Sequence, residues 1–203
     1  MIVYGLPVSR LLRHVDILAD FISRTAATQS RYVVAISGFG GSGKSTVSGR
    51  LSRRLNASII HVDDFIAADK NGARENFPHD WQKLEDLTLA HLKTENEIVA
   101  RIYDWQSNRQ VLEKTRVGKY VIIEGSAGAL IRDDFRAYFD LTVWIDVPAD
   151  IAHARGKRRD RVEQGVDHDH LWDEVWSPLE NAWFDEHRPD LKVDVLLSND
   201  GPP

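Results

Sequence analysis

The sequence predicts a three-layer α/β fold in which helices cover both faces of a five-stranded parallel sheet. Short apolar runs, each typical of a strand buried on both faces, occur at 32–36, 57–62, 119–124, 141–147 and 192–197. The stretches between these runs read as helices and loops. Strands that alternate with helices favour a parallel, doubly wound sheet.

The ends of the chain carry their own signals. Residues 9–28 read as an amphipathic helix with apolar side chains on one side, and Ser9 is the expected N-cap. A further helical pattern covers residues 84–102. Residues 199–203 are polar and proline-rich, so we expect them to fray.

We expect the 203 residues to form a single domain, because that length suffices for one sizeable core. Within it, residues 1–30 would supply the N-terminal helix. Residues from about 66 to 116 would form helices and loops over a substrate site, and residues from about 150 to 170 a mobile lid.

Composition narrows the function classes. The chain has 31 acidic and 26 basic residues and a net charge of −5, which argues against a protein built to hold nucleic acid. It has no cysteine, and no apolar run approaches the ~18 residues of a membrane span. Charged residues interrupt the N-terminal region, so no secretory segment is expected. We therefore expect a soluble cytoplasmic protein without membrane or nucleic-acid partners, and the sequence is compatible with a homo-oligomer.

One glycine-rich run predicts the ligand. The segment from Gly38 to Thr46 matches the phosphate-binding P-loop pattern G-x-x-x-x-G-K-S/T. A predicted strand precedes it, and Val47, Leu51 and Leu55 follow it at helical spacing. The expected triphosphate-binding residues are Gly38, Gly40, Gly41, Ser42, Gly43, Lys44, Ser45 and Thr46.

The residue types of this loop fit that chemistry. Glycines let several backbone N–H groups point at one phosphate, and the helix that begins there favours an anion. Lys44 would place a cation on the outer phosphates, and the Ser45 hydroxyl would ligate Mg²⁺. ATP and Mg²⁺ are the expected ligands.

Acidic residues follow two other predicted strands, at the sheet edge where ligands bind in such folds. Asp63 and Asp64 end the second strand, and Asp63 could accept the proton of a substrate hydroxyl while Asp64 acts as a helix cap or supports it. Glu124 ends the third strand and could hold Mg²⁺ directly or through water. The alternatives are a simple helix cap and a solvated strand end.

A basic segment follows the fourth strand. Residues 155–161 contain five cations, which on an ordinary helix would form a solvated face. Next to a triphosphate they could close as a lid over the transferring phosphate. Arg155 and Arg159 lie one helical turn apart and could act together.

Segments 76–81 and 103–109 combine aromatic rings with hydrogen-bonding groups, which suits a flat or sugar-like substrate. Candidate acceptor-binding residues are Asp63, Phe65, His79, Tyr103 and Arg109. Trp172, Trp176 and Trp183 recur at helical spacing and are expected in the core. Residues 167–170, although rich in His and Asp, are expected to be a solvated loop and not a metal site.

Together these motifs resemble the uridine kinase and phosphoribulokinase branch of P-loop kinases over roughly residues 31–165. The resemblance rests on Ile36-Ser37-Gly38, Gly43-Lys44-Ser45-Thr46, Val62-Asp63-Asp64-Phe65, Tyr103-Asp104, Ile122-Ile123-Glu124-Gly125 and the stretch from Asp140 to Asp160. It implies a P-loop NTPase fold and transfer of the ATP γ-phosphate to a hydroxyl of a small metabolite.

The resemblance also implies site roles. By it, Asp63 matches the catalytic aspartate, Glu124 the acid near Mg²⁺, and Arg155 and Arg159 the lid arginines that act with Lys44. Tyr103 falls where such enzymes contact the nucleoside.

Other functions remain open at this point. The acceptor could be a nucleoside, pantothenate, nicotinamide riboside or another sugar. A nucleotide-dependent switch or ATPase is a second class, although the chain has no Asn-Lys-x-Asp guanine motif. A P-loop protein that binds nucleotide without catalysis is a third.

Overall fold

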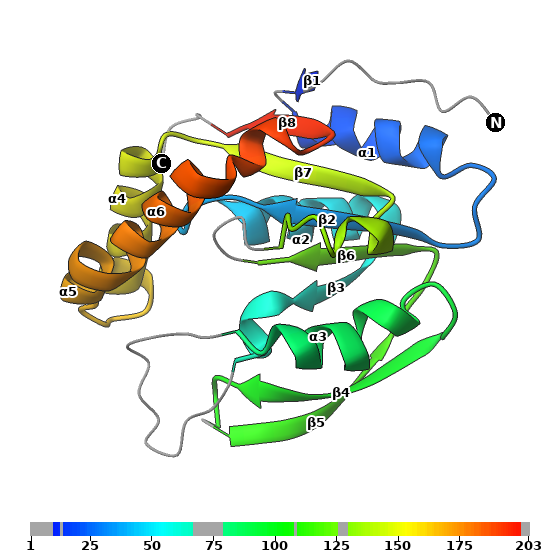
Figure 1. The fold of residues 1–203 in the computed structure, drawn as a ribbon, viewed down its shortest axis with the longest axis horizontal. Helices are drawn as coiled ribbons and strands as arrows, with labels where there is room; N and C mark the ends of the chain where they lie inside the picture. The colour runs from blue at the N-terminus through cyan, green and yellow to red at the C-terminus, as the bar shows by residue number, and fades with distance from the viewer. Residues whose placement is uncertain (1–9, 13, 67–78, 108, 126–129, 200–203) are drawn as a thin grey trace.

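The computed structural model describes residues 10–12, 14–66, 79–107, 109–125 and 130–199. The five predicted strands are all present, in a parallel sheet of six strands with the order β1-β8-β7-β2-β6-β3 (Figure 1). The strands are β1 Arg10–Leu12, β2 Tyr32–Ser37, β3 Ser58–His61, β6 Tyr120–Glu124, β7 Leu141–Asp146 and β8 Val195–Ser198.

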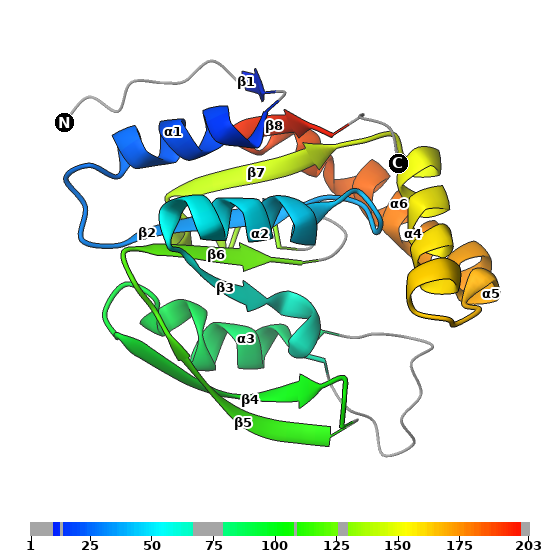
Figure 2. The ribbon, with the colours of Figure 1, turned by 180° about the vertical axis from the view of Figure 1, so that it is seen from behind.

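The helices surround this sheet. Their bounds are α1 Val15–Thr25, α2 Lys44–Leu55, α3 Trp81–Leu87, α4 Ala149–Glu163, α5 Asp169–Leu171 and α6 Ser177–His187. In Figure 2, α1 and α2 lie side by side on one face, and α4 to α6 gather at the carboxyl ends of the strands. In the described part of the chain, no helix combines the length and apolar character needed to cross a membrane.

The burial of its residues shows that β2 lies in the middle of the core. All six residues of β2 are buried, and its neighbours β6 and β7 are buried over nearly their whole length. A strand flanked by helices on both faces needs apolar side chains on both sides, which is the pattern that the sequence shows. The carboxyl ends of β2, β6 and β3 therefore lie at one edge of the sheet.

The predicted N-terminal helix is wrong at its start. Arg10–Leu12 form β1, which pairs in parallel with β8, and α1 begins only at Val15. Pairing with the edge of the sheet satisfies the backbone groups of these residues, and such tertiary pairing overrides a local helical pattern. The predicted cap Ser9 and residues 200–203 of the predicted tail lie outside the described residues. The expectation that the tail frays from Asn199 is wrong at that residue, which donates to the carbonyl oxygens of Asp146 and Ser42.

The predicted helix over 84–102 is also wrong, and so is the expectation of only helices and loops over 66–116. Helix α3 ends at Leu87, and β4 (Glu97–Asp104) and β5 (Arg109–Arg116) form an antiparallel hairpin (Figure 1). Along β4, residues are alternately buried and exposed, the period-two pattern of a half-buried strand. The helical spacing just before it obscured this alternation.

One hydrogen bond joins this hairpin to the turn after β3. Trp105 Nε1 donates to Asp64 Oδ1 at 3.0 Å. Burial of the Asp64 carboxyl, together with the nearby negative charges of Asp63 and Glu113, raises its pKa to about 6, against opposing effects of His61 and of the Trp105 hydrogen bond. At neutral pH Asp64 is therefore a carboxylate that is less stable in the folded protein than in the unfolded chain, although the bond from Trp105 favours it.

This raised pKa predicts a pH-dependent stability. The native state binds more protons at Asp64 than the unfolded chain between about pH 4 and 6, so stability falls as the pH rises through that window. D64N keeps an oxygen for Trp105 and carries no charge. We expect its melting temperature to exceed that of the wild type by about 2–5 °C at pH 7.5, with a much smaller gain near pH 4.

The control is D20N, which removes an exposed carboxyl on α1. Thermal unfolding of the three proteins at both pH values decides the matter. A D64N gain that is equal at pH 4 and pH 7.5 would show that Asp64 does not cause the pH dependence.

Candidate functional site

The glycine loop between β2 and α2 forms the centre of the site. Gly41 and Gly43 have φ values of 77° and 96°, in the left-handed region that favours glycine. A Cβ atom on Gly41 would lie 2.0 Å from the carbonyl oxygen of Ala152, and one on Gly43 would lie 2.4 Å from Asn199 Nδ2. The backbone conformation therefore favours glycine at both positions, and close packing against the backbone of α4 also requires it at Gly41.

Lys44 begins α2 and folds back over the loop. Its ammonium group donates to the carbonyl oxygens of Gly38 and Phe39, each at 3.0 Å, and the residue is only 8% exposed. An ammonium group has three donors, so these two bonds leave one for a phosphate. The first N–H groups of α2 have no intrahelical partner and favour an anion at the same place.

The two predicted metal ligands lie together. Ser45 Oγ donates to Glu124 Oε1 at 3.1 Å, and Glu124 is buried at the end of β6. His61 Nδ1 lies 2.6 Å from the same carboxylate oxygen, and this hydrogen bond raises the pKa of His61 against the effect of burial. A carboxylate beside a hydroxyl is a hard oxygen pair of the kind that Mg²⁺ prefers.

No cluster of three or more metal-ligating side chains occurs in the described ranges. The residues nevertheless fit Mg²⁺, which is commonly held by one or two protein oxygens with water and substrate phosphates as its other ligands.

Asp63 lies in the turn after β3, and His79 reaches it from the segment just before α3. His79 Nε2 is 3.2 Å from Asp63 Oδ1, and the His79 ring stacks on Trp81 with its centroid 4.9 Å away. Loss of hydration raises the pKa of Asp63, but the hydrogen bond to His79 and the charges of His79, Lys44 and His61 outweigh it, and the pKa is lowered. Asp63 is therefore a carboxylate at neutral pH.

The other predicted acceptor residues occupy different places. Tyr103 is buried and its ring meets Trp105 edge-on, with centroids 5.0 Å apart. Phe65 is a core residue, 2% exposed, and Arg109 is an exposed residue at the start of β5. Residues 76–78 of the predicted substrate loop lie outside the described residues.

Both predicted lid arginines are on α4, but they contact different partners. Arg155 Nη1 donates to the carbonyl oxygen of Asn199 at 2.9 Å. Arg159 donates through Nε and Nη2 to Asp160, at 3.0 and 2.7 Å. The backbone of α4 rests directly on the loop at Gly41. In this structure, α4 packs against one side of the loop.

Two site residues carry no signal in the sequence. Both carboxylate oxygens of Glu180, on α6, accept from the N–H of Gly40, at 2.9 and 3.1 Å. His153 Nε2, on α4, lies 3.0 Å from Glu180 Oε2. Neither residue belongs to a recognisable motif, and Glu180 is 140 positions from Gly40.

The tryptophan and histidine segments nearby also differ from expectation. Trp172 is buried, as predicted, and donates to Asp160 Oδ2 at 2.8 Å, whereas Trp176 and Trp183 are half-buried. The predicted solvated loop 167–170 is wrong in its second half, because α5 begins at Asp169.

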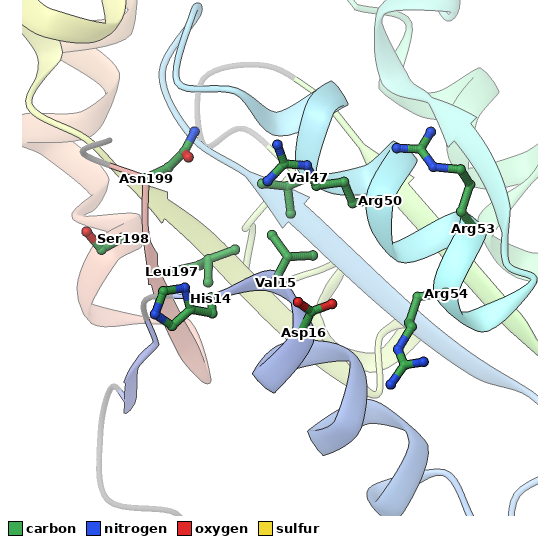
Figure 3. A pocket seen from close by; sticks show the side chains of 10 residues that line it. All are labelled: His14, Val15, Asp16, Val47, Arg50, Arg53, Arg54, Leu197, Ser198 and Asn199. Atoms are coloured by element: carbon green, nitrogen blue, oxygen red, sulfur yellow. The ribbon is translucent and has the colours of Figure 1, made fainter. Parts of the chain in front are cut away.

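A pocket of about 470 Å³ adjoins the loop at the carboxyl end of β8 (Figure 3). Its floor is apolar and its rim is largely basic. Figure 3 shows Arg50 extended toward Asn199 beside Val47. Asn199 Nδ2 donates to the carbonyl oxygen of Ser42 at 2.8 Å, so the pocket is continuous with the loop. The lining residues are His14, Val15, Asp16, Val47, Arg50, Arg53, Arg54, Leu197, Ser198 and Asn199.

Comparison with known proteins agrees with this geometry. A uridine kinase of Brevibacillus brevis is 31% identical over 147 residues, covering 66% of this chain and 68% of that protein. A uridine kinase of Borreliella burgdorferi is 29% identical over 143 residues, covering 66% and 69%.

Solved structures share the fold. A structure named as a possible uridine kinase from Bacillus stearothermophilus has a TM-score of 0.66 at 21% identity, covering 90% of this chain and 98% of that one. A candidate fructose transport system kinase from Silicibacter sp. TM1040 has a TM-score of 0.70 at 22% identity, covering 91% and 98%.

A family profile described as an AAA domain matches residues 34–175, which include the loop, Asp63, Glu124 and both arginines. The chain therefore belongs to the family that this AAA-domain profile describes and to the uridine kinase-like P-loop kinases.

Proposed function

We propose that this kinase transfers the γ-phosphate of ATP to a hydroxyl group of a nucleoside-like metabolite. The observation that carries the proposal is the sequence of groups along one edge of the sheet. Lys44 lies in the loop, Ser45 and Glu124 meet beside it, and Asp63 with His79 follows at the end of β3. This order supplies a phosphate site, a metal site and a base side by side.

The order of the strands supports one orientation of ATP across the loop, with its reacting phosphate near β3 and its nucleoside near β8. Asp63 follows β3, on one side of the loop, whereas Asn199 and the pocket of Figure 3 adjoin β8, on the other. If the reacting phosphate faces Asp63, the nucleoside end of ATP must point toward β8. The apolar floor and basic rim of that pocket suit a base and sugar with a phosphate attached.

The reaction needs a base and charge stabilisation. Asp63 accepts the proton of the acceptor hydroxyl as its oxygen bonds the γ-phosphorus and the bond to the β-phosphate oxygen breaks, which yields ADP and a phosphate ester. The lowered pKa of Asp63 keeps it ready to accept that proton. Lys44 stabilises the charge on the transferring phosphate from its place in the loop.

Ser45 and Glu124 are the residues that would hold Mg²⁺. The ion, when bound, neutralises phosphate charge and orients the terminal phosphates. His61 Nδ1 lies 2.6 Å from Glu124 Oε1, and this hydrogen bond raises the pKa of His61, so a cation at that carboxylate would disfavour the protonated form of His61.

Aromatic groups next to the two aspartates support a flat acceptor. His79 stacks on Trp81 beside Asp63, and Trp105, with Tyr103 against it, bonds Asp64. A ring can stack on such side chains while a sugar hydroxyl reaches Asp63. A sugar, pantothenate or nicotinamide riboside are the alternative acceptors.

The first test combines an acceptor panel with D63N. We expect one nucleoside to consume ATP well above the rate with water, and D63N to lower kcat by about 10²- to 10⁴-fold with little change in ATP affinity, because only the base is lost. Coupled ADP release measures the rates, and titration with a non-hydrolysable ATP analogue measures affinity.

D64N is the matched comparison at the neighbouring position. If D64N loses activity and D63N does not, the base is Asp64. If no acceptor exceeds water, the chain is an ATPase or a switch, and the proposed phosphotransfer is wrong.

E124Q tests the metal site. Its amide keeps the shape of the side chain but removes the charge, so we expect the Mg²⁺ concentration for half-maximal activity to rise by about tenfold or more. E97Q, at an exposed ion pair of β4, is the control and should match the wild type. An unchanged Mg²⁺ requirement in E124Q would remove Glu124 from the metal site.

R50A tests the donor pocket. Removing this guanidinium from the rim should weaken binding of the ATP analogue by about three- to tenfold and leave the acceptor KM unchanged. R24A, at an exposed position in the last turn of α1, is the control. Equal binding by R50A and the wild type would place the nucleoside elsewhere.

A further inference from the structure

Glu180 is a buried acid in contact with a loop that is expected to bind phosphates. The residue is 8% exposed, and its carboxylate lies beside the N–H of Gly40 and the ring of His153, which is also 8% exposed. A buried carboxylate is costly unless it is paired, and negative charge next to a triphosphate opposes binding. Glu180 must therefore have a function that offsets the cost of its burial and of its charge near the phosphates.

Its contacts with the loop indicate that role. Accepting a backbone N–H with both oxygens fixes the orientation of the peptide group between Phe39 and Gly40. Trp172 closes off the same residue, because a Cβ atom on Gly40 would lie 2.6 Å from the Trp172 ring. The N–H of Gly40 therefore points at Glu180 and away from the phosphate site. The peptide group before Gly40 is held in one orientation, and the rest of the loop continues from it.

His153 extends this contact to α4. The His153 ring meets the Phe39 ring edge-on at 5.6 Å and partners Glu180 at 3.0 Å, so loop, α4 and α6 meet at one point. His153 precedes Arg155 by two positions on α4. The pair of Glu180 and His153 thus sets where α4 rests against the glycines.

We propose that Glu180 is a positioning residue for the donor nucleotide. By holding Gly40 and, through His153, α4, it keeps the later N–H groups of the loop and the start of α2 aimed at the phosphates. This inference rests on the proposed function only in that the loop binds ATP; it needs no particular acceptor.

The test is calorimetric titration of the full chain with Mg²⁺ and a non-hydrolysable ATP analogue. E180A removes the acceptor of the Gly40 N–H and should bind at least about tenfold more weakly. E180Q keeps an acceptor oxygen in place and should bind within about threefold of the wild type. E186A, at an exposed position on the same helix, is the matched control and should bind as the wild type does.

A second readout does not depend on nucleotide. Hydrogen exchange at the Gly40 amide should accelerate in E180A and stay slow in E180Q, because exchange requires the bond to Glu180 to open. If E180A is too unstable to purify, E180D serves in its place. Its shorter side chain withdraws the carboxylate by one methylene, and we expect the same weakening.

The outcomes separate the two proposals. Absence of analogue binding by the wild type would overturn the proposed function. Normal binding by the wild type together with equal binding by E180A would overturn the role of Glu180. Equal weakening of E180Q and E180A would also overturn it, since acceptance of the Gly40 N–H is the role assigned.

Discussion

The register between β2, β6 and β3 is the constraint on which the site depends. In these pairings, Glu124 lies opposite Ile36 on one side and His61 on the other. A shift of one residue would turn Glu124 to the opposite face of the sheet. With the observed register, Glu124 at the end of β6 contacts Ser45 at the start of α2. The turn that carries Asp63 follows the end of β3, next to Glu124.

Hydrogen bonds to charged side chains hold this edge together in the ligand-free structure. Lys44 is held by loop carbonyl oxygens, Glu124 by Ser45 and His61, and Gly40 by Glu180. Each buried charge has a partner, which is what the low dielectric of the interior requires. A phosphate can therefore bind to the remaining donor of Lys44 and the first N–H groups of α2 while these existing bonds stay in place.

The two sides of the loop are built differently. On the β8 side, the backbone of α4 rests directly on Gly41, and α6 reaches Gly40 through the side chain of Glu180. On the β3 side, α3 and the hairpin β4–β5 contact the site through side chains such as His79 and Trp105. Substitutions change side-chain contacts more readily than backbone packing. We therefore expect the residues on the β3 side to determine which acceptor binds.

The sequence by itself determined the strand–loop–helix unit, five strands of the sheet and the acidic residues at the ends of two of them, because glycine spacing, apolar runs and strand-end polarity are local properties. It also predicted that Ser45 and Glu124 would share a site. The tertiary structure alone decided β1, the hairpin, the separate partners of Arg155 and Arg159, and the contact of Glu180 with Gly40. β1 pairs with β8, and Glu180 contacts Gly40, across more than a hundred residues, so no local periodicity records these contacts. The alternation of the hairpin is local, but the helical spacing before it competes with it, and the partners of the two arginines depend on how α4 packs.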